Sequence, residues 1–217
     1  MSAPHPTPRL DIVSDVICPW CYVGKHRLSR ALAQLGEFPL EIRWRPYELN
    51  PGMPREGMSR RDYCERKFGS WEHARRLYAR VEAAAAEDGL PLHVDRIART
   101  PNTRRAHRLI EHAASQGLQD ALVDALFQAY FVDGRDVGDT ATLQAIGVAV
   151  GLDPAGVAAV LADDAQDTAI EAAEQSAREA GVDGVPAFLY NGRLLFSGAQ
   201  SADTIALLLT RARTRGL

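Results

Sequence analysis

The sequence Cys18-Pro19-Trp20-Cys21 lies at the boundary between an apolar segment and a helix-like segment. The apolar residues 10–17 predict a buried strand, and Tyr22 to Leu35 predict a helix that stops at Gly36. Two thiols separated by two residues at a helix start can close a small disulfide, and the unpaired N–H groups of the first turn favour a thiolate there. This placement therefore indicates thiol–disulfide exchange, which needs a nucleophilic thiol and a resolving thiol.

A Cys-x-x-Cys pair is also half of a zinc site, but zinc requires about four ligands. The third cysteine, Cys64, together with His26 would have to complete such a site. The Pro-Trp dipeptide between the thiols and the strand-to-helix junction favour the redox interpretation, so we expect no metal. Because one cysteine is left over after any pairing, a stabilising disulfide framework is not expected either, and Cys64 receives no role.

The segments around this motif predict a β-α-β unit followed by helices. Leu40 to Tyr47 alternates apolar and polar residues, which is typical of a strand. Two strands joined through a helix should lie parallel in one sheet with a right-handed crossover. Residues 50–181 show apolar residues at helical spacing, interrupted by stop and N-cap signals.

The last part of the chain returns to strands. Residues 185–190 and 194–197 are joined through Asn191-Gly192, a strong signal for a tight hairpin, and a helix capped near Ser201 closes the chain. We therefore predict an α/β fold in which β-α-β and β-β-α halves form one sheet. In this prediction residues 9–49 and 182–217 build the sheet domain, and residues 50–181 form a large all-helical insertion.

Gly184-Val185-Pro186 opens the third predicted strand. A proline at a strand entry can be an ordinary edge residue. In a fold of the thioredoxin type, however, this loop packs against the dithiol with a cis peptide before the proline. The carbonyl and N–H of Val185 would then be available to pair with an extended substrate backbone.

Four stretches carry a resemblance to a known family: residues 14–24 around the dithiol, residues 45–51 (Arg-Pro-Tyr-Glu-Leu-Asn-Pro), Pro101-Asn102-Thr103 with residues 106–108, and residues 184–188 with Gly198-Ala199-Gln200. Together they resemble the FrnE-type branch of the DsbA family over nearly the whole chain. The resemblance implies a thioredoxin-like fold with a helical insertion and thiol–disulfide oxidoreductase or isomerase activity. It also implies Cys18 as nucleophile, Cys21 as resolving thiol and Pro186 as the cis-proline. Ala187 departs from the pattern, because the family often has threonine there.

Kappa-class glutathione transferases and 2-hydroxychromene-2-carboxylate isomerases share this fold and resemble the chain in the Asn-Pro, Pro-Asn-Thr and C-terminal Gly regions. At the position of Cys18 these relatives carry a serine, and that serine holds the thiol of glutathione. Two cysteines here favour disulfide exchange over a glutathione-dependent transferase or isomerase acting on a small molecule. Glutathione is then a candidate redox partner, and no bound cofactor is expected.

Several other residues are candidates with ordinary structural alternatives. Asp15 could relay the proton of Cys21 if it is buried, or it could cap the following helix. Asn50 and Asn102 could bind substrate, although an asparagine before a proline favours a turn and Asn102 could cap the next helix. Trp20 could line a peptide groove beside the thiols, while His107 on an amphipathic helix is more often structural.

The net charge of −3 and pI of about 6.1 argue against nucleic acid or an anionic membrane surface as partners. No stretch is apolar for long enough to span a membrane, and residues 1–8 contain no apolar signal core. We expect a cytoplasmic protein whose partners are disulfide-containing proteins or small thiols. In that compartment the expected direction is net reduction or isomerisation, and the sequence assigns no oligomeric state.

Overall fold

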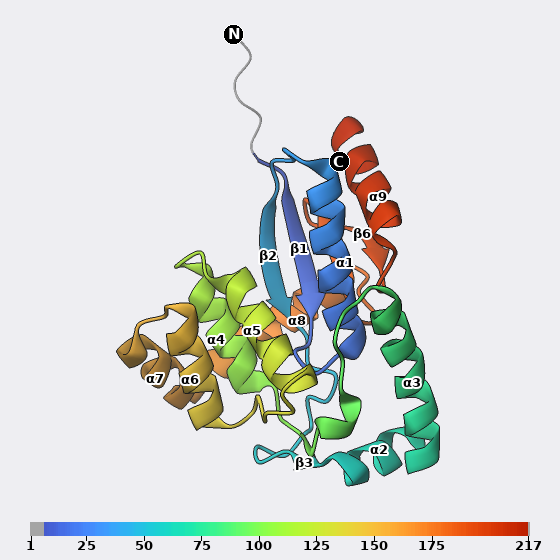
Figure 1. Ribbon diagram of the computed structural model, residues 1–217. Coiled ribbons are helices and arrows are strands. Elements are labelled where there is room, and N and C mark those ends of the chain that lie inside the picture. The colour runs from blue at the N-terminus through green and yellow to red at the C-terminus, as the bar shows by residue number, and fades with distance from the viewer. Residues whose placement is uncertain (1–6, 217) are drawn as a thin grey trace.

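A computed structural model describes residues 7–216 and contains a four-stranded sheet covered by helices (Figure 1). The strands are β1 (Arg9–Ser14), β2 (Glu41–Pro46), β5 (Ala187–Tyr190) and β6 (Arg193–Ser197), and their order is β2-β1-β5-β6. β1 is parallel to β2 and antiparallel to β5, which is antiparallel to β6. This arrangement confirms the predicted α/β thioredoxin-like fold with its β-α-β and β-β-α halves.

The junction after β1 differs from the prediction by a few residues. The strand ends at Ser14 rather than residue 17, because a turn begins at Asp15, whose carbonyl accepts a hydrogen bond from the Cys18 N–H at 3.0 Å. Helix α1 (Pro19–Leu35) therefore starts three residues earlier than predicted, with Cys18 as its N-cap. Proline suits the first helical position, since the N–H that it lacks has no partner there in any case.

Helices cover both faces of the sheet. α1 and α9 (Ala202–Thr214) lie together on one face, where Leu10 and Ile12 point into the main core. α8 (Asp167–Glu179) covers the other face, where Val13 meets Ala177. The alternation of these β1 side chains follows from the two-residue period of a strand, so a sheet buried on both faces explains the apolar β1 sequence.

The segment between the two parts of the sheet is mostly helical. Its helices are α2 (Arg60–Phe68), α3 (Trp71–Glu87), α4 (Arg104–Ala114), α5 (Gln119–Phe131), α6 (Thr140–Val150) and α7 (Pro154–Ala162), with short 3-10 turns at Val94–Arg96 and Asp164–Gln166. Two short strands, β3 (Met58–Ser59) and β4 (Arg99–Thr100), pair antiparallel. Two residues are too few to show strand alternation, so the sequence pattern did not reveal this pair.

The division of the chain at residues 50 and 181 stays a prediction. α8 lies inside the 50–181 segment, yet it packs on the sheet like a helix of the sheet domain. Residue 217, the last of the predicted sheet domain, lies outside the described residues. The helical segment and the sheet share one continuous hydrophobic core.

Aromatic packing joins α1 to the helical segment. The Tyr22 ring stacks on Phe131 with centroids 5.4 Å apart, and Phe127 lies 5.5 Å from Tyr22 and 6.4 Å from Trp44 of β2. Phe127, Tyr130 and Phe131 are all buried. This cluster holds α5 against the helix that carries the dithiol.

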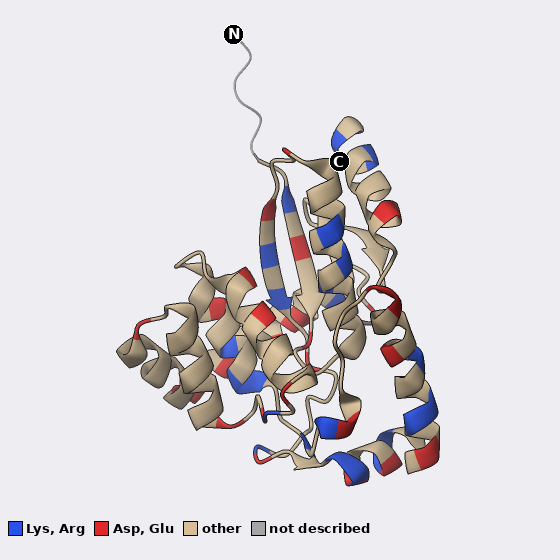
Figure 2. Cartoon of the chain, viewed as in Figure 1, with Lys and Arg blue, Asp and Glu red and all other residues tan. Residues whose placement is uncertain are grey.

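Ion pairs add a second connection between α1 and the helical segment. Asp88, which follows α3, accepts hydrogen bonds from Arg27 Nε at 2.5 Å and from Arg30 at 2.9 Å. Figure 2 shows basic bands along α1 and an acidic bend at the end of α3, with both signs interspersed over the helices on the visible face. Because Arg30 is half exposed, its pair with Asp88 contributes little, whereas the pair between Arg27 and Asp88 is mostly buried.

Replacing Phe127 by alanine should lower the free energy of unfolding by about 3–5 kcal/mol, because it removes a fully buried ring and leaves a cavity between α1, α5 and β2. Chemical denaturation followed by circular dichroism measures the change. Leu207→Ala on α9, where the side chain is 49% exposed, is the control and should change stability by no more than about 0.5 kcal/mol. Equal losses in the two variants would contradict this account of the core.

Candidate functional site

The two thiols of the motif lie at the first turn of α1. Cys18 and Cys21 are both reduced and buried, and only 5% and 1% of their surfaces are exposed. The Cys21 N–H donates to the Cys18 carbonyl at 3.0 Å, which fixes both residues in one helical turn. The Cys18 side chain makes no capping hydrogen bond, and its position at the N-terminus of α1 places it at the positive end of the helix dipole, which favours a negative charge.

The loop before β5 packs against this turn. The Val185–Pro186 peptide bond is cis, and the Cys18 thiol donates a hydrogen bond to the Val185 carbonyl with sulfur and oxygen 3.6 Å apart. On α1 the close approach favours glycine, because a Cβ on Gly24 would lie only 3.1 Å from Cγ of Pro186 and would press the loop away from the helix. The structure thus brings Cys18, Val185 and Pro186 together from opposite ends of the chain.

Burial raises the pKa of the Cys21 thiol well above its ordinary value, and the hydrogen bond with Cys18 and the charge of Cys18 raise it further. Hydrogen bonds from the Ser14 side chain and the Asp15 N–H act in the opposite direction but are outweighed. Cys21 therefore stays a protonated thiol until it is needed. The sequence analysis did not identify Ser14 as a site residue. Its position at the end of β1, four residues before Cys18, is the signal that could have done so.

Asp15 is fully buried, but its carboxylate points away from the dithiol and toward the chain after β2. One oxygen accepts the Leu49 N–H at 2.8 Å, and the other accepts the Ile17 N–H at 3.4 Å. Of the proton relay and the cap considered for Asp15, these contacts match the cap. The capped N–H groups belong to the turn before α1 and to the segment after β2. A proton relay through Asp15 stays a prediction.

His107 of α4 lies next to Asp15, with Nε2 of the imidazole 3.5 Å from Oδ1 of the carboxylate. Glu48, after β2, accepts hydrogen bonds from the Arg104 guanidinium, and the Glu48 N–H donates to Glu174 of α8 at 2.6 Å. The sequence analysis missed both glutamates. Glu174 left a signal, since it occupies a position on the buried stripe of α8 between Ile170 and Ala177.

Competing effects set the pKa of His107. Burial lowers it, but the Asp15 carboxylate 3.5 Å away, together with Glu48 and Glu174, outweighs burial and raises the pKa above 6.5. For Glu48 burial is the largest effect and raises the pKa, against the opposing influence of Arg104 and His107. The cluster therefore holds an imidazolium among buried carboxyl groups.

The two candidate asparagines have protein partners. Oδ1 of Asn50 accepts from Lys67 Nζ at 2.9 Å, and Nδ2 of Asn50 lies 3.4 Å from the Tyr63 hydroxyl. Asn102 donates to the Met53 carbonyl at 2.8 Å and accepts the Arg104 N–H at 3.0 Å. These contacts match the turn and cap alternatives, and a substrate-binding role for either residue stays a prediction.

Trp20 lies in the first turn of α1, and 37% of its surface is exposed. It is one of only a few large apolar side chains at the described surface with this much exposure. An exposed indole next to a buried thiol is a contact that an approaching substrate can cover.

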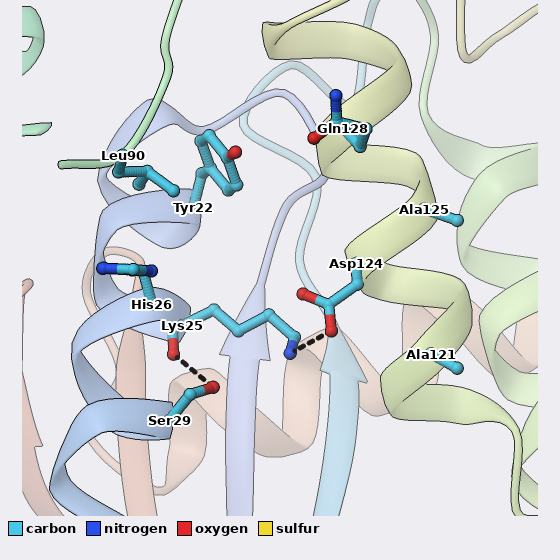
Figure 3. A pocket seen from close by; sticks show the side chains of 9 residues that line it. All are labelled: Tyr22, Lys25, His26, Ser29, Leu90, Ala121, Asp124, Ala125 and Gln128. Atoms are coloured by element: carbon cyan, nitrogen blue, oxygen red, sulfur yellow. Dashed lines mark hydrogen bonds and ion pairs between the residues drawn. The ribbon is translucent and has the colours of Figure 1, made fainter.

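A pocket of about 460 Å³ opens beside α1, between that helix and α5 (Figure 3). Lys25 crosses it toward α5, where its Nζ lies 2.7 Å from Asp124 and 3.2 Å from Asp120. The lysine is buried and its charge is directed to these carboxylates, so it does not serve the dithiol. His26 lines the same pocket one residue further along α1.

Cys64 lies in a separate apolar cluster with Met53, Tyr63 and Ala74, apart from the cluster of Cys18 and Cys21. Within residues 7–216, no group of three or more His, Cys, Asp or Glu side chains is arranged to hold a metal ion. None of the helices described has the length and apolar character needed to cross a bilayer.

The comparisons with known proteins agree with this geometry. A probable DsbA oxidoreductase from Streptomyces coelicolor is 36% identical, with a TM-score of 0.84 over 95% of this chain and 90% of that one. Two more distant structures share the fold. A 2-hydroxychromene-2-carboxylate isomerase is 22% identical (TM-score 0.70; 95% of each chain), and the cytosolic disulfide reductase DsbM from Pseudomonas aeruginosa, solved with glutathione, is 18% identical (TM-score 0.65; 95% and 98%). The family model for the DSBA-like thioredoxin domain matches residues 9–210, and the chain belongs to that family.

Proposed function

We propose that the protein is a thiol–disulfide oxidoreductase that exchanges disulfides through Cys18 and Cys21. The observation that carries this proposal is the position of the Cys18 thiol, at the start of α1 and facing the Val185 carbonyl, with the Cys21 thiol buried in the same turn. Disulfide exchange requires a nucleophilic thiol and a second thiol that resolves the mixed disulfide, and the first turn of α1 carries both.

The cycle begins when the Cys18 thiolate attacks one sulfur of a substrate disulfide. A Cys18–substrate mixed disulfide forms, and the other substrate sulfur leaves as a thiolate that takes up a proton. Cys21 then loses its proton and attacks the Cys18 sulfur, which forms the Cys18–Cys21 disulfide and releases the second substrate thiol. Two electrons pass from the dithiol to the substrate, and two equivalents of a small thiol restore the dithiol by the reverse steps.

Glutathione is the small thiol that we propose for this return step. The Pseudomonas disulfide reductase with the same fold was solved with glutathione, and it is described as cytosolic. We accordingly propose a cytoplasmic protein of the FrnE type that acts in the direction of reduction or isomerisation.

Substrate recognition is proposed to use the backbone of Val185 and the indole of Trp20. Main-chain pairing tolerates many sequences, because every residue of an extended substrate carries the same N–H and carbonyl groups. The partners that fit are therefore proteins or peptides with an accessible disulfide.

The decisive experiment compares cysteine variants in the glutathione-coupled reduction of a peptide disulfide. Cys18→Ser should lower the rate at least about 100-fold, because it removes the nucleophile. Cys21→Ser should accumulate a mixed disulfide at Cys18, visible by mass spectrometry as the added mass of the peptide or of glutathione. Cys64→Ser is the matched control and should keep the wild-type rate, since Cys64 lies in a separate cluster.

The competing function, a glutathione-dependent transferase or isomerase, gives a different result in the same variants. Isomerisation of 2-hydroxychromene-2-carboxylate that survives in Cys18→Ser, with no disulfide reduction by the wild-type protein, would contradict our proposal.

The resolving step should be strongly pH dependent. Burial is the largest cause of the raised Cys21 pKa, and it persists when Cys18 is in a mixed disulfide. The thiol is protonated below its raised pKa, so the rate constant for loss of a Cys18–glutathione disulfide should still rise above pH 9.0, where an ordinary cysteine is half ionised. Rapid acid quench and mass spectrometry of the Cys64→Ser protein measure it, and a plateau below pH 8 would show that Cys21 is not the buried, high-pKa group described.

A further inference from the structure

A buried group of charged residues lies directly behind the turn that carries the dithiol. Asp15, Glu48 and Glu174 are 0%, 2% and 3% exposed, and His107 is 2% exposed. Arg104 pairs with Glu48, and Arg178 pairs with Glu174 at 3.1 Å. Among the described residues, His107 is the only basic side chain within 4 Å of the Asp15 carboxylate. Without a charged imidazole, the Asp15 carboxylate would be a buried anion with no cation beside it, which is costly.

Asp15 is also the residue through which this cluster reaches the two thiols. Its carbonyl accepts the Cys18 N–H at 3.0 Å, and its N–H hydrogen-bonds the Cys21 thiol. Its carboxylate binds the N–H groups of Ile17 and Leu49. One residue thus touches both cysteines with its backbone and the His107 imidazole with its side chain.

We propose that His107 is a positioning residue for the dithiol: it holds the Asp15 carboxylate, and through it the turn from Asp15 to Cys18, in the geometry from which Cys21 attacks a mixed disulfide at Cys18. His107 belongs to α4 and touches neither reacting sulfur. The helical segment therefore contributes to the resolving step through a single buried contact.

Charge explains why the imidazole must be protonated for this role. Asp15, Glu48 and Glu174 all favour the imidazolium, and Arg104 is occupied by Glu48 and Glu171. The raised pKa extends the pH range in which His107 is charged, and the charge is lost as the pH rises through that raised value. A neutral His107 would leave the buried Asp15 carboxylate with no cation to hold it in place.

The inference rests on the proposed disulfide exchange, and it concerns one step of it. In that step Cys21 gives up its proton, its sulfur bonds to the Cys18 sulfur, and the bond between Cys18 and the substrate sulfur breaks. The substrate leaves as a thiolate, which is protonated by solvent. A small displacement of the attacking sulfur is enough to slow such a step by as much as about 100-fold.

The test compares His107→Gln with His112→Gln in the Cys64→Ser background. Both histidines lie on α4, but His112 packs against Gly156 of α7 and is far from the thiols. His107→Gln should slow the loss of a Cys18–glutathione disulfide at least about tenfold at pH 7, while alkylation of Cys18 by iodoacetamide changes less than about twofold. His112→Gln should change neither rate. Asp15→Asn should slow the same step, and the double variant should be no slower than the slower single variant, because the two residues act as one unit.

Unchanged resolution in a folded His107→Gln protein would overturn the inference, and so would an equal loss in both steps. The proposed function would survive either result, since it fails only if wild-type protein does not exchange disulfides. NMR of the unmutated protein covers the case of a variant that does not fold. The His107 ring protons should titrate above pH 6.5, because the adjacent Asp15 carboxylate raises the pKa of the imidazole. A His107 titration below pH 6.5 would overturn the inference.

Discussion

The contact between the first turn of α1 and the loop at Val185 and Pro186 is the constraint on which the rest of this structure depends. It joins the β-α-β half of the sheet to the β-β-α half beside the nucleophile, with Gly24 as the residue that permits the approach. The segment that connects β2 to β5 must leave this contact intact. The hydrophobic core that it shares with the sheet, in which Tyr22 stacks on Phe131, holds it in place.

Short-range patterns were sufficient for most of the fold. The strand alternation of residues 40–47, the Asn191-Gly192 turn and the Ser201 cap each depend on neighbouring residues, and each occurs where it was predicted. Asn191 and Gly192 both have positive φ, as a tight hairpin requires. The error at the start of α1 has a local cause as well, because the turn at Asp15 was assigned to the strand and the first helical residue, Pro19, was left outside the helix.

The site was less predictable, because its polar contacts join residues that are distant in sequence. The motif identified Cys18 and Cys21, but no local pattern could show that His107 meets Asp15 or that Glu174 binds the Glu48 N–H. Asn102 illustrates the opposite case. A position before a helix predicted a cap, and its side chain does accept the Arg104 N–H, with no information from the rest of the chain. The sequence therefore predicts the reactive side chains of a site more readily than the distant charged side chains that surround them.

In the proposed function, the hydrogen bond between Cys18 and Val185 would connect activation of the nucleophile with recognition of a substrate. A thiol donates to the Val185 carbonyl at 3.6 Å, whereas a thiolate has no proton to donate. Ionisation of Cys18 therefore frees the Val185 carbonyl at the moment when the sulfur becomes reactive. An extended substrate backbone can donate to that carbonyl and place its disulfide at the adjacent sulfur.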